Sequence, residues 1–176
     1  IPQAHAEISI AALNAGKHVH CEKPLATNLA DAKKVLQQAK IKNLRVGCAP
    51  DTFLGAVHQT ARKLLDDGWI GKPIAGTAFF MSRGPEFWHP NPDFFYDVGG
   101  GPMLDMGPYF ITALVNYLGP INRIIGVASK SFDERTATSK EHFGRKIPVK
   151  VPTLNMGVLE FASGALITIG ISFDVH

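Results

Sequence analysis

The chain has 176 residues, which suits one domain or parts of two and is enough to bury a substantial core. Hydrophobic residues make up 45% of it and charged residues 19%, the composition of a water-soluble globular protein. A net charge of +3 without a long basic run argues against a nucleic-acid-binding surface, and no apolar stretch approaches the ~20 residues of a membrane span.

The first part of the chain alternates between predicted helices and short strands. Apolar spacing and helix-ending residues predict helices at 2–15 and 27–40 and strands at 18–21 and 44–50. The apolar stripe of the first helix is expected along Ile8, Ala11, Ala12 and Ala15. Thr27 or Asn28 is the expected N-cap of the second helix. This order is typical of a parallel sheet in an α/β domain.

The rest of the chain has a different pattern, which favours antiparallel strands and a few helices. The spacing predicts helices at 53–68 and 103–119 and strands at 73–82, 121–132 and 153–175, the last segment being two strands joined at Ser163-Gly164. Residues 83–102 are rich in glycine, proline and aromatics, which predicts an ordered lid or pocket wall, and 133–152 are expected to be irregular. The fold class is therefore α/β followed by α+β.

Cysteine and histidine usage gives little sign of a disulfide or a metal site. Cys21 and Cys48 fit a reducing cytoplasm and would pair only if neighbouring strands brought them together. On a strand His18 and His20 share one face while Cys21 points away, which spoils a three-ligand site, so no metal is expected.

Lys23 is the first candidate catalytic residue, because it stands where a strand meets a loop. Pro24 favours extended geometry at Lys23, and an X-Pro bond there can be cis. The carboxyl ends of parallel strands are where α/β sheets bind ligands, and a partly buried lysine there can act as acid and base. Spacing alone favours a surface lysine in a turn, paired with Glu22.

Asp105 and Tyr109 are the second candidate pair. They stand at i and i+4, so on a continuous helix they face the same way, and the carboxylate can orient the phenol. Pro108 lies between them and is expected to kink the helix. The plainer alternative is an aspartate interacting with the helix dipole beside a tyrosine half in the core.

Two features of residues 83–102, called the aromatic segment below, also suggest ligand contact. Gly99, Gly100 and Gly101 precede a helix, but their spacing matches no phosphate loop, so a tight turn is favoured. Trp88 and His89 could stack on a sugar and hydrogen-bond to it, or simply pack the lid.

Three motifs together resemble the Gfo/Idh/MocA oxidoreductases. "AGKHVHCEKPLA" is similar to the first signature of that family, and "GGGPMLDMGPY" is similar to the second, a glycine pair followed by Asp and then His or Tyr. "DDGWIGKP" resembles the segment that joins the first helix of the substrate domain to its sheet. The order and spacing agree over nearly the whole chain.

The resemblance implies two domains and a nicotinamide cofactor. Residues 1–49 correspond to the C-terminal part of a Rossmann domain that binds NAD or NADP, and 50–176 to a substrate and dimerisation domain with a mostly antiparallel open sheet. The glycine-rich cofactor loop has no counterpart in the chain, and both ends look cut, so we expect this chain alone to bind NAD(H) poorly and to be inactive.

The resemblance also implies roles for individual residues. Lys23 matches the catalytic lysine, Asp105 the aspartate of the second signature, and Tyr109 the position where many members carry the catalytic histidine; that departure leaves the proton route open between Tyr109 and Lys23. The expected cofactor-binding residues are Pro2, His5, Glu22, Lys23 and Pro24. Arg83, His89 and Asp97 are the expected substrate contacts.

The expected function is hydride transfer between NAD(P) and a hydroxyl-bearing carbon of a sugar or cyclic polyol, in a cytoplasmic homo-oligomer without nucleic-acid or membrane partners. One alternative is a non-catalytic ligand-binding module, and another is a redox-neutral enzyme that keeps its NAD tightly bound. A third is a dimerisation module that pairs through the apolar strand "ALITIGIS".

Overall fold

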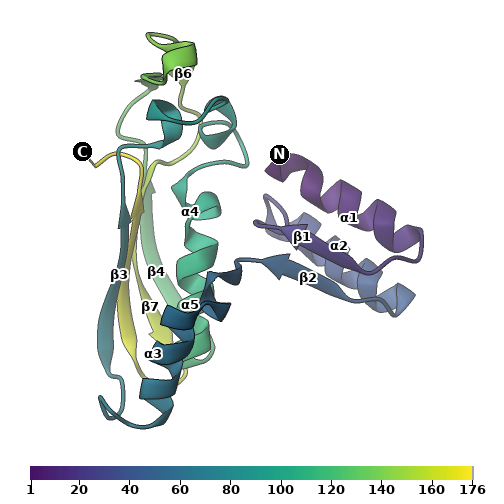
Figure 1. Cartoon of the computed structure of the whole chain (residues 1–176), viewed down its shortest axis with the longest axis vertical. Helices are drawn as coiled ribbons and strands as arrows, with labels where there is room; N and C mark the ends of the chain where they lie inside the picture. The colour runs from purple at the N-terminus through teal and green to yellow at the C-terminus, as the bar shows by residue number, and fades with distance from the viewer. Residues whose placement is uncertain (176) are drawn as a thin grey trace. The chain divides into compact units, whose positions relative to one another are not determined.

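The computed structural model of the chain describes residues 1–175. It forms two compact units, Ile1–Asp51 and Thr52–His176 (Figure 1). None of the helices in the described residues combines the length and apolar character needed to cross a bilayer.

The first unit has two helices and a two-stranded parallel sheet. Its elements are a 3₁₀ turn η1 (Pro2–Ala4), α1 (His5–Asn14), β1 (Val19–Glu22), α2 (Leu29–Lys42) and β2 (Val46–Ala49). β1 pairs with β2 in parallel, as the helix–strand order predicted. The side chain of Asn28 accepts a hydrogen bond of 2.9 Å from the Asp31 N–H, so Asn28 is the N-cap of α2.

The core of this unit lies between its two helices, and it corrects the expected stripe of α1. Leu13, Val35 and Ala39 are buried there, and Ile10 packs against them. Ile8 is 65% exposed, so the stripe that begins at Ile8 was wrong. A helix buries the face that meets its neighbours, and in α1 that face carries Leu13 and Ile10.

The second unit contains the remaining helices and strands. The helices are α3 (Ala56–Asp66), α4 (Pro102–Asp105) and α5 (Gly107–Leu118). The strands are β3 (Ala75–Met81), β4 (Ile121–Ser129), β5 (Glu134–Thr136), β6 (Lys146–Pro148), β7 (Leu154–Phe161) and β8 (Leu166–Ser172). Short 3₁₀ turns η2 to η5 cover Asp51–Leu54, Pro85–Phe87, Asp93–Phe95 and Lys140–His142.

The main sheet has four strands in the order β3-β8-β7-β4. β4–β7 and β7–β8 are antiparallel, while β3 runs parallel to β8. The sheet is therefore mostly antiparallel, as expected. The β7–β8 connection turns at Gly164, whose φ of 88° favours glycine, in agreement with the predicted hairpin.

One face of this sheet is covered by α4 and α5, and the other is open within the unit (Figure 1). Ile167, Ile169 and Ile171 of β8 are buried against the helices, so within the "ALITIGIS" strand these isoleucines lie on the covered face. On the opposite face, Ile125 and Val127 of β4 are 62% and 75% exposed. Alternation along a strand separates these two sets of side chains.

Residues 133–152 are more ordered than expected. β5 and β6 form a small antiparallel hairpin, in which Arg135 is the register partner of Ile147. Ile147 and Val149 are buried against Phe95 and Tyr96 of the aromatic segment. A polar composition concealed this hairpin, because only alternate residues of such short strands enter the core.

Candidate active site

Lys23 follows the last residue of β1, at the carboxyl edge of the parallel pair. Glu22, the final residue of β1, is the register partner of Ala49, the final residue of β2. The edge therefore presents Glu22 and then Lys23, at the end of parallel strands where α/β sheets bind ligands. The Lys23–Pro24 peptide bond is cis, and Pro24 is buried.

A contact between α1 and the loop after β1 gathers the predicted cofactor-binding residues of this unit. Nδ1 of His5, the first residue of α1, lies 2.7 Å from the carbonyl oxygen of Pro24. The Lys23 N–H donates to a carboxylate oxygen of Glu22 at 3.1 Å. Pro2 lies in the 3₁₀ turn that leads into α1. The structure thus brings His5 and Pro24 together, beside Glu22 and Lys23.

The chemistry of this edge fits one part of a dinucleotide. A carboxylate such as that of Glu22 accepts hydrogen bonds from ribose hydroxyls, and the Lys23 amine supplies N–H donors. The glycines of the chain do not form a G-x-G-x-x-G motif, so the backbone cradle for a pyrophosphate is not among these residues. The fit therefore concerns the ribose and nicotinamide end alone.

Asp105 and Tyr109 lie in the second unit, and they do not share one helix. Asp105 ends α4 and Tyr109 lies in the first turn of α5, with Met106 between the two helices. The expectation of a continuous helix was wrong, and so was the argument from i, i+4 spacing. Pro108 was expected to disturb the helix; the break precedes it, at Met106.

Tyr109 also lines a cavity of about 760 Å³ between α3, α5 and β3. Most of its lining is apolar, but His58 and Tyr117 meet in it, with Nδ1 of His58 at 2.5 Å from the Tyr117 hydroxyl. Burial raises the pKa of Tyr117 above its usual value. Both Asp105 and Tyr109 are half-buried.

The glycine run before α4 is a tight turn, as spacing favoured. Gly99 and Gly101 have φ of 88° and 91°, which favours glycine. The Gly101 N–H donates to the Phe95 carbonyl at 2.6 Å, and a Cβ on Gly100 would lie 2.8 Å from that carbonyl group. The run therefore lets the aromatic segment pass close to the start of α4.

The three expected substrate contacts have different surroundings. The guanidinium of Arg83 is exposed and lies 3.9 Å from the ring centroid of Phe87. His89 packs edge-on against Phe94 and Phe95, with centroids 5.4 and 5.0 Å away. Asp97 accepts from the Val98 N–H and pairs with a lysine, and both contacts lower its pKa.

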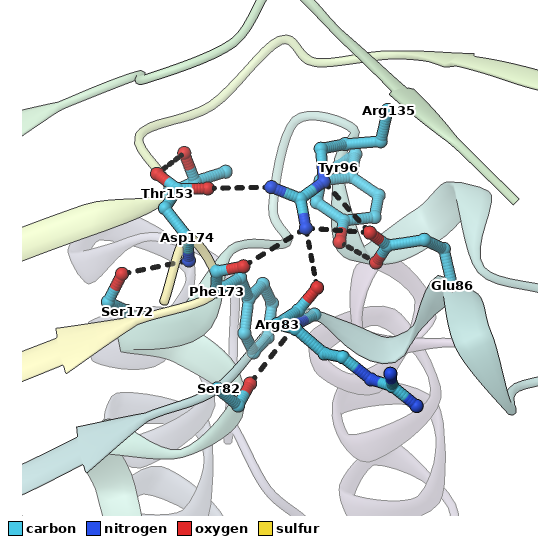
Figure 2. A network of polar contacts seen from close by, with 10 residues as sticks. Ser82, Arg83, Glu86, Tyr96, Arg135, Thr153, Ser172, Phe173 and Asp174 are labelled. Carbon is cyan, nitrogen blue, oxygen red and sulfur yellow. Dashed lines mark hydrogen bonds and ion pairs between the residues drawn. The ribbon is translucent and has the colours of Figure 1, made fainter. Parts of the chain in front are cut away.

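The structure also contains a buried charged network that the sequence analysis missed (Figure 2). Arg135 of β5 binds Glu86 and Asp174, and all three side chains are less than 10% exposed. The available signal was Glu86 itself, a carboxylate inside a segment of aromatics and prolines. Nothing in the local pattern connects it with Arg135, which is 49 residues away.

Two family models match the chain. The model described as "Oxidoreductase family, NAD-binding Rossmann fold" matches residues 1–49, and the model described as "GFO/IDH/MocA C-terminal domain" matches residues 58–176.

Known proteins agree with these matches. The chain is 27% identical to levoglucosan dehydrogenase of Pseudarthrobacter phenanthrenivorans over 98% of its own length and 47% of that protein. It is 37% identical to inositol 2-dehydrogenase of Salmonella typhimurium over 50% of its length and 27% of that protein. A solved levoglucosan dehydrogenase in complex with NADH and levoglucosan superposes with a TM-score of 0.85 at 26% identity, covering 99% of this chain and 46% of the other. The chain thus spans less than half the length of these relatives.

Proposed function

Because the chain belongs to the Gfo/Idh/MocA family of oxidoreductases, we propose that the whole protein transfers a hydride between NAD(P) and a hydroxyl-bearing carbon of a sugar or cyclic polyol. The observation that carries this proposal is the sequence Glu22-Lys23-Pro24 at the carboxyl edge of the parallel pair β1–β2. A carboxylate and an amine at that edge suit a cofactor ribose and a reacting hydroxyl.

The names of the relatives support the substrate class. Levoglucosan dehydrogenase and inositol 2-dehydrogenase are named for cyclic substrates that carry several hydroxyl groups. The solved relative is titled as a complex with NADH and levoglucosan, which supports a nicotinamide cofactor here.

We propose that Pro2, His5, Glu22, Lys23 and Pro24 form the cofactor side of the site. The nicotinamide, when bound, supplies the hydride chemistry. Lys23 takes the proton of the substrate hydroxyl when the hydride leaves the carbon, and returns it in the reverse direction. Tyr109 assists this proton transfer and Asp105 orients it.

On the substrate side, Arg83, His89 and Asp97 are the proposed contacts. Arg83 presents an exposed guanidinium, and His89 has a ring held in place by its aromatic neighbours. Asp97 would have to exchange its lysine partner, Lys150, for a substrate hydroxyl. Of the three proposed substrate contacts, Asp97 is therefore the one with the least support.

The two units then correspond to two proposed domains. Residues 1–49 would be the C-terminal part of a dinucleotide-binding domain, and residues 50–176 a substrate and dimerisation domain. The open sheet face supports a homo-oligomer, since Ile125, Val127 and Phe79 are exposed on it to 62%, 75% and 46%. A cytoplasmic location is supported by the two free cysteines.

The test is spectroscopic. The full-length protein is mixed with NAD or NADP and a panel of cyclic polyols and sugars, and NAD(P)H absorbance is followed. Growth of absorbance with at least one substrate is expected. Ligand binding without any hydride transfer in either direction would favour the non-catalytic module, and a cofactor that copurifies and never exchanges would favour the redox-neutral enzyme.

A further inference from the structure

Arg135 uses all three guanidinium nitrogens in the buried network of the second unit (Figure 2). Nε donates to Glu86 Oε1 at 2.8 Å, and Nη1 donates to Asp174 Oδ1 at 3.0 Å. Nη2 donates to the carbonyl oxygens of Arg83 and Phe173. The planar fork of arginine can reach four groups at once in this way, whereas a lysine ammonium cannot.

The two carboxylates are completed by hydroxyl donors. The Tyr96 hydroxyl donates to Glu86 Oε2, and the Thr153 hydroxyl donates to Asp174 Oδ2 at 2.7 Å. Burial and the neighbouring Glu86 raise the pKa of Tyr96 far above its usual value, so its hydroxyl keeps the donated proton. Each of the four carboxylate oxygens therefore has a donor, which a buried charged network requires.

This network joins three segments that are far apart in the sequence. Arg83, Glu86 and Tyr96 belong to the aromatic segment, Arg135 to the β5–β6 hairpin, and Asp174 follows β8. Before α4 begins at Pro102, the aromatic segment contains only the 3₁₀ turns η3 and η4 as regular elements. Its shape therefore depends on contacts such as these.

The attachment continues from the network to the segment that carries Asp105. Tyr96 follows η4, and the carbonyl of its neighbour Phe95 accepts the Gly101 N–H at 2.6 Å. Gly101 is the N-cap residue of α4, which ends at Asp105. Only one residue, Met106, then separates α4 from α5. Anchoring Tyr96 thus restrains the start of the Asp105–Tyr109 segment.

We propose that Arg135 is a positioning residue, which holds the aromatic segment and, through Phe95 and Gly101, the segment that bears Asp105 and Tyr109. Its proposed role is indirect, because its side chain is 7% exposed and its hydrogen bonds go to groups of the chain itself. This inference rests on the proposed function, because it assigns Arg135 to the substrate side of that reaction.

A second arginine of the same hairpin supplies a matched control. Arg145 Nη1 and Nη2 donate hydrogen bonds to the two carboxylate oxygens of Asp93, in η4 of the aromatic segment, at 2.7 and 2.6 Å. Its side chain and that of Asp93 are 39% and 44% exposed, against 7% and 8% for Arg135 and Glu86. Water replaces a lost partner at an exposed pair, but not at a buried one.

The experiment compares Arg135→Gln, Arg135→Lys and Arg145→Gln in the full-length protein, at a temperature where circular dichroism shows each variant folded. For Arg135→Gln, kcat/KM for the sugar or polyol should fall at least ~100-fold, because two buried carboxylates lose their partner. The affinity for NADH should stay within ~2-fold, since the residues proposed to bind the cofactor belong to the other unit. Arg135→Lys should recover part of the loss, and Arg145→Gln should change kcat/KM by less than ~3-fold.

A second readout does not depend on turnover. In a full-length protein whose Trp69 and any tryptophan outside these 176 residues are replaced by Phe, Trp88 is the remaining tryptophan and reports on the aromatic segment. Trp88 is already 58% exposed, so Arg135→Gln should increase the acrylamide quenching of its fluorescence by ~1.5-fold, while Arg145→Gln should leave it near the parent value. If Arg135→Gln does not fold, Tyr96→Phe replaces it, and a smaller change in the same direction is expected.

The proposal is overturned if folded Arg135→Gln keeps the kcat/KM and Trp88 quenching of its parent, or if Arg145→Gln matches its losses. A failure of the proposed function looks different: the unmodified protein would turn over none of the sugars and polyols, while the quenching comparison would still decide whether Arg135 holds the segment.

Discussion

Cys21 of β1 and Cys48 of β2 are register partners on adjacent parallel strands. Neighbouring strands lie ~4.8 Å apart, so the two thiols face the same side at a spacing that a disulfide could bridge. A disulfide between them requires neighbouring strands, and β1 and β2 are neighbours. Both cysteines are free thiols here.

The pairing predicts a pH dependence for the reactivity of Cys48. Burial raises the pKa of its thiol, and the neighbouring Cys21 adds to the effect. At pH 8 the fraction of Cys48 present as reactive thiolate is therefore smaller in the folded chain than in the unfolded chain. The two fractions become similar only when the pH exceeds the raised pKa. Iodoacetamide should modify Cys48 at least ~5-fold more slowly at pH 8 in the native chain than in urea, a gap that narrows toward pH 10. Peptide mass mapping gives the rates, and equal rates at pH 8 would contradict the prediction.

Alkaline pH should expose the role of the Tyr96 phenol in stability. Burial and then the hydrogen bond to Glu86 raise its pKa in the folded chain. Above the ordinary tyrosine pKa of ~10, the unfolded chain releases this proton and the folded chain keeps it, so stability falls as pH rises, by at most ~1.4 kcal/mol per pH unit. Below pH ~10 the contribution is fully present. Between pH 8 and pH 10.5 the urea midpoint of unfolding should fall less in Tyr96→Phe than in its parent. Tyr117→Phe is the control for a less buried phenol.

Asn28 should contribute to stability as the N-cap of α2. Its side chain accepts the Asp31 N–H at 2.9 Å, and alanine would leave that donor without its partner in the cap. Asn28→Ala should lower the free energy of unfolding by ~1 kcal/mol, measured by urea titration with far-UV circular dichroism. Asn28→Ser is the matched control, because serine caps equally well; a similar loss in both variants would remove the capping explanation.

Lys23→Ala tests the proposed proton transfer. In the full-length protein kcat should fall by ~10²-fold or more, the scale of a lost acid–base group. NADH binding, followed by its fluorescence, separates a catalytic loss from a binding loss. Lys17→Ala, which removes an exposed lysine before β1, is expected to leave kcat unchanged. A normal kcat in Lys23→Ala would take Lys23 out of the mechanism.

Much of the first unit and the position of Lys23 could be predicted, because the sequence features that specify them lie within a few residues of one another. The order of helices and strands, the Asn28 cap, the strand end before Lys23 and the turn at Gly164 each depend on residues within a few positions of one another. Family signatures are also continuous stretches, so the matched family agrees with the resemblance drawn from them.

Other features depended on partners that lie far along the chain. The buried face of α1 is the one that meets α2, and it does not include Ile8. Within β8, which isoleucines are covered depends on where α4 and α5 pack. The Asp105–Tyr109 pair was assigned to one helix because its spacing allowed it, whereas the chain breaks at Met106.

The sequence by itself determined the alternation of elements, the family and the carboxyl-edge position of Lys23, since short-range sterics, capping and apolar period specify these. Only the tertiary structure decided that Arg135 would be buried between Glu86 and Asp174, which lie 49 and 39 residues away. The residues next to a charged side chain in a polar stretch do not predict that it will be buried. Burial of the charge is stable only when carboxylates pair with it, and these come together only when distant segments pack.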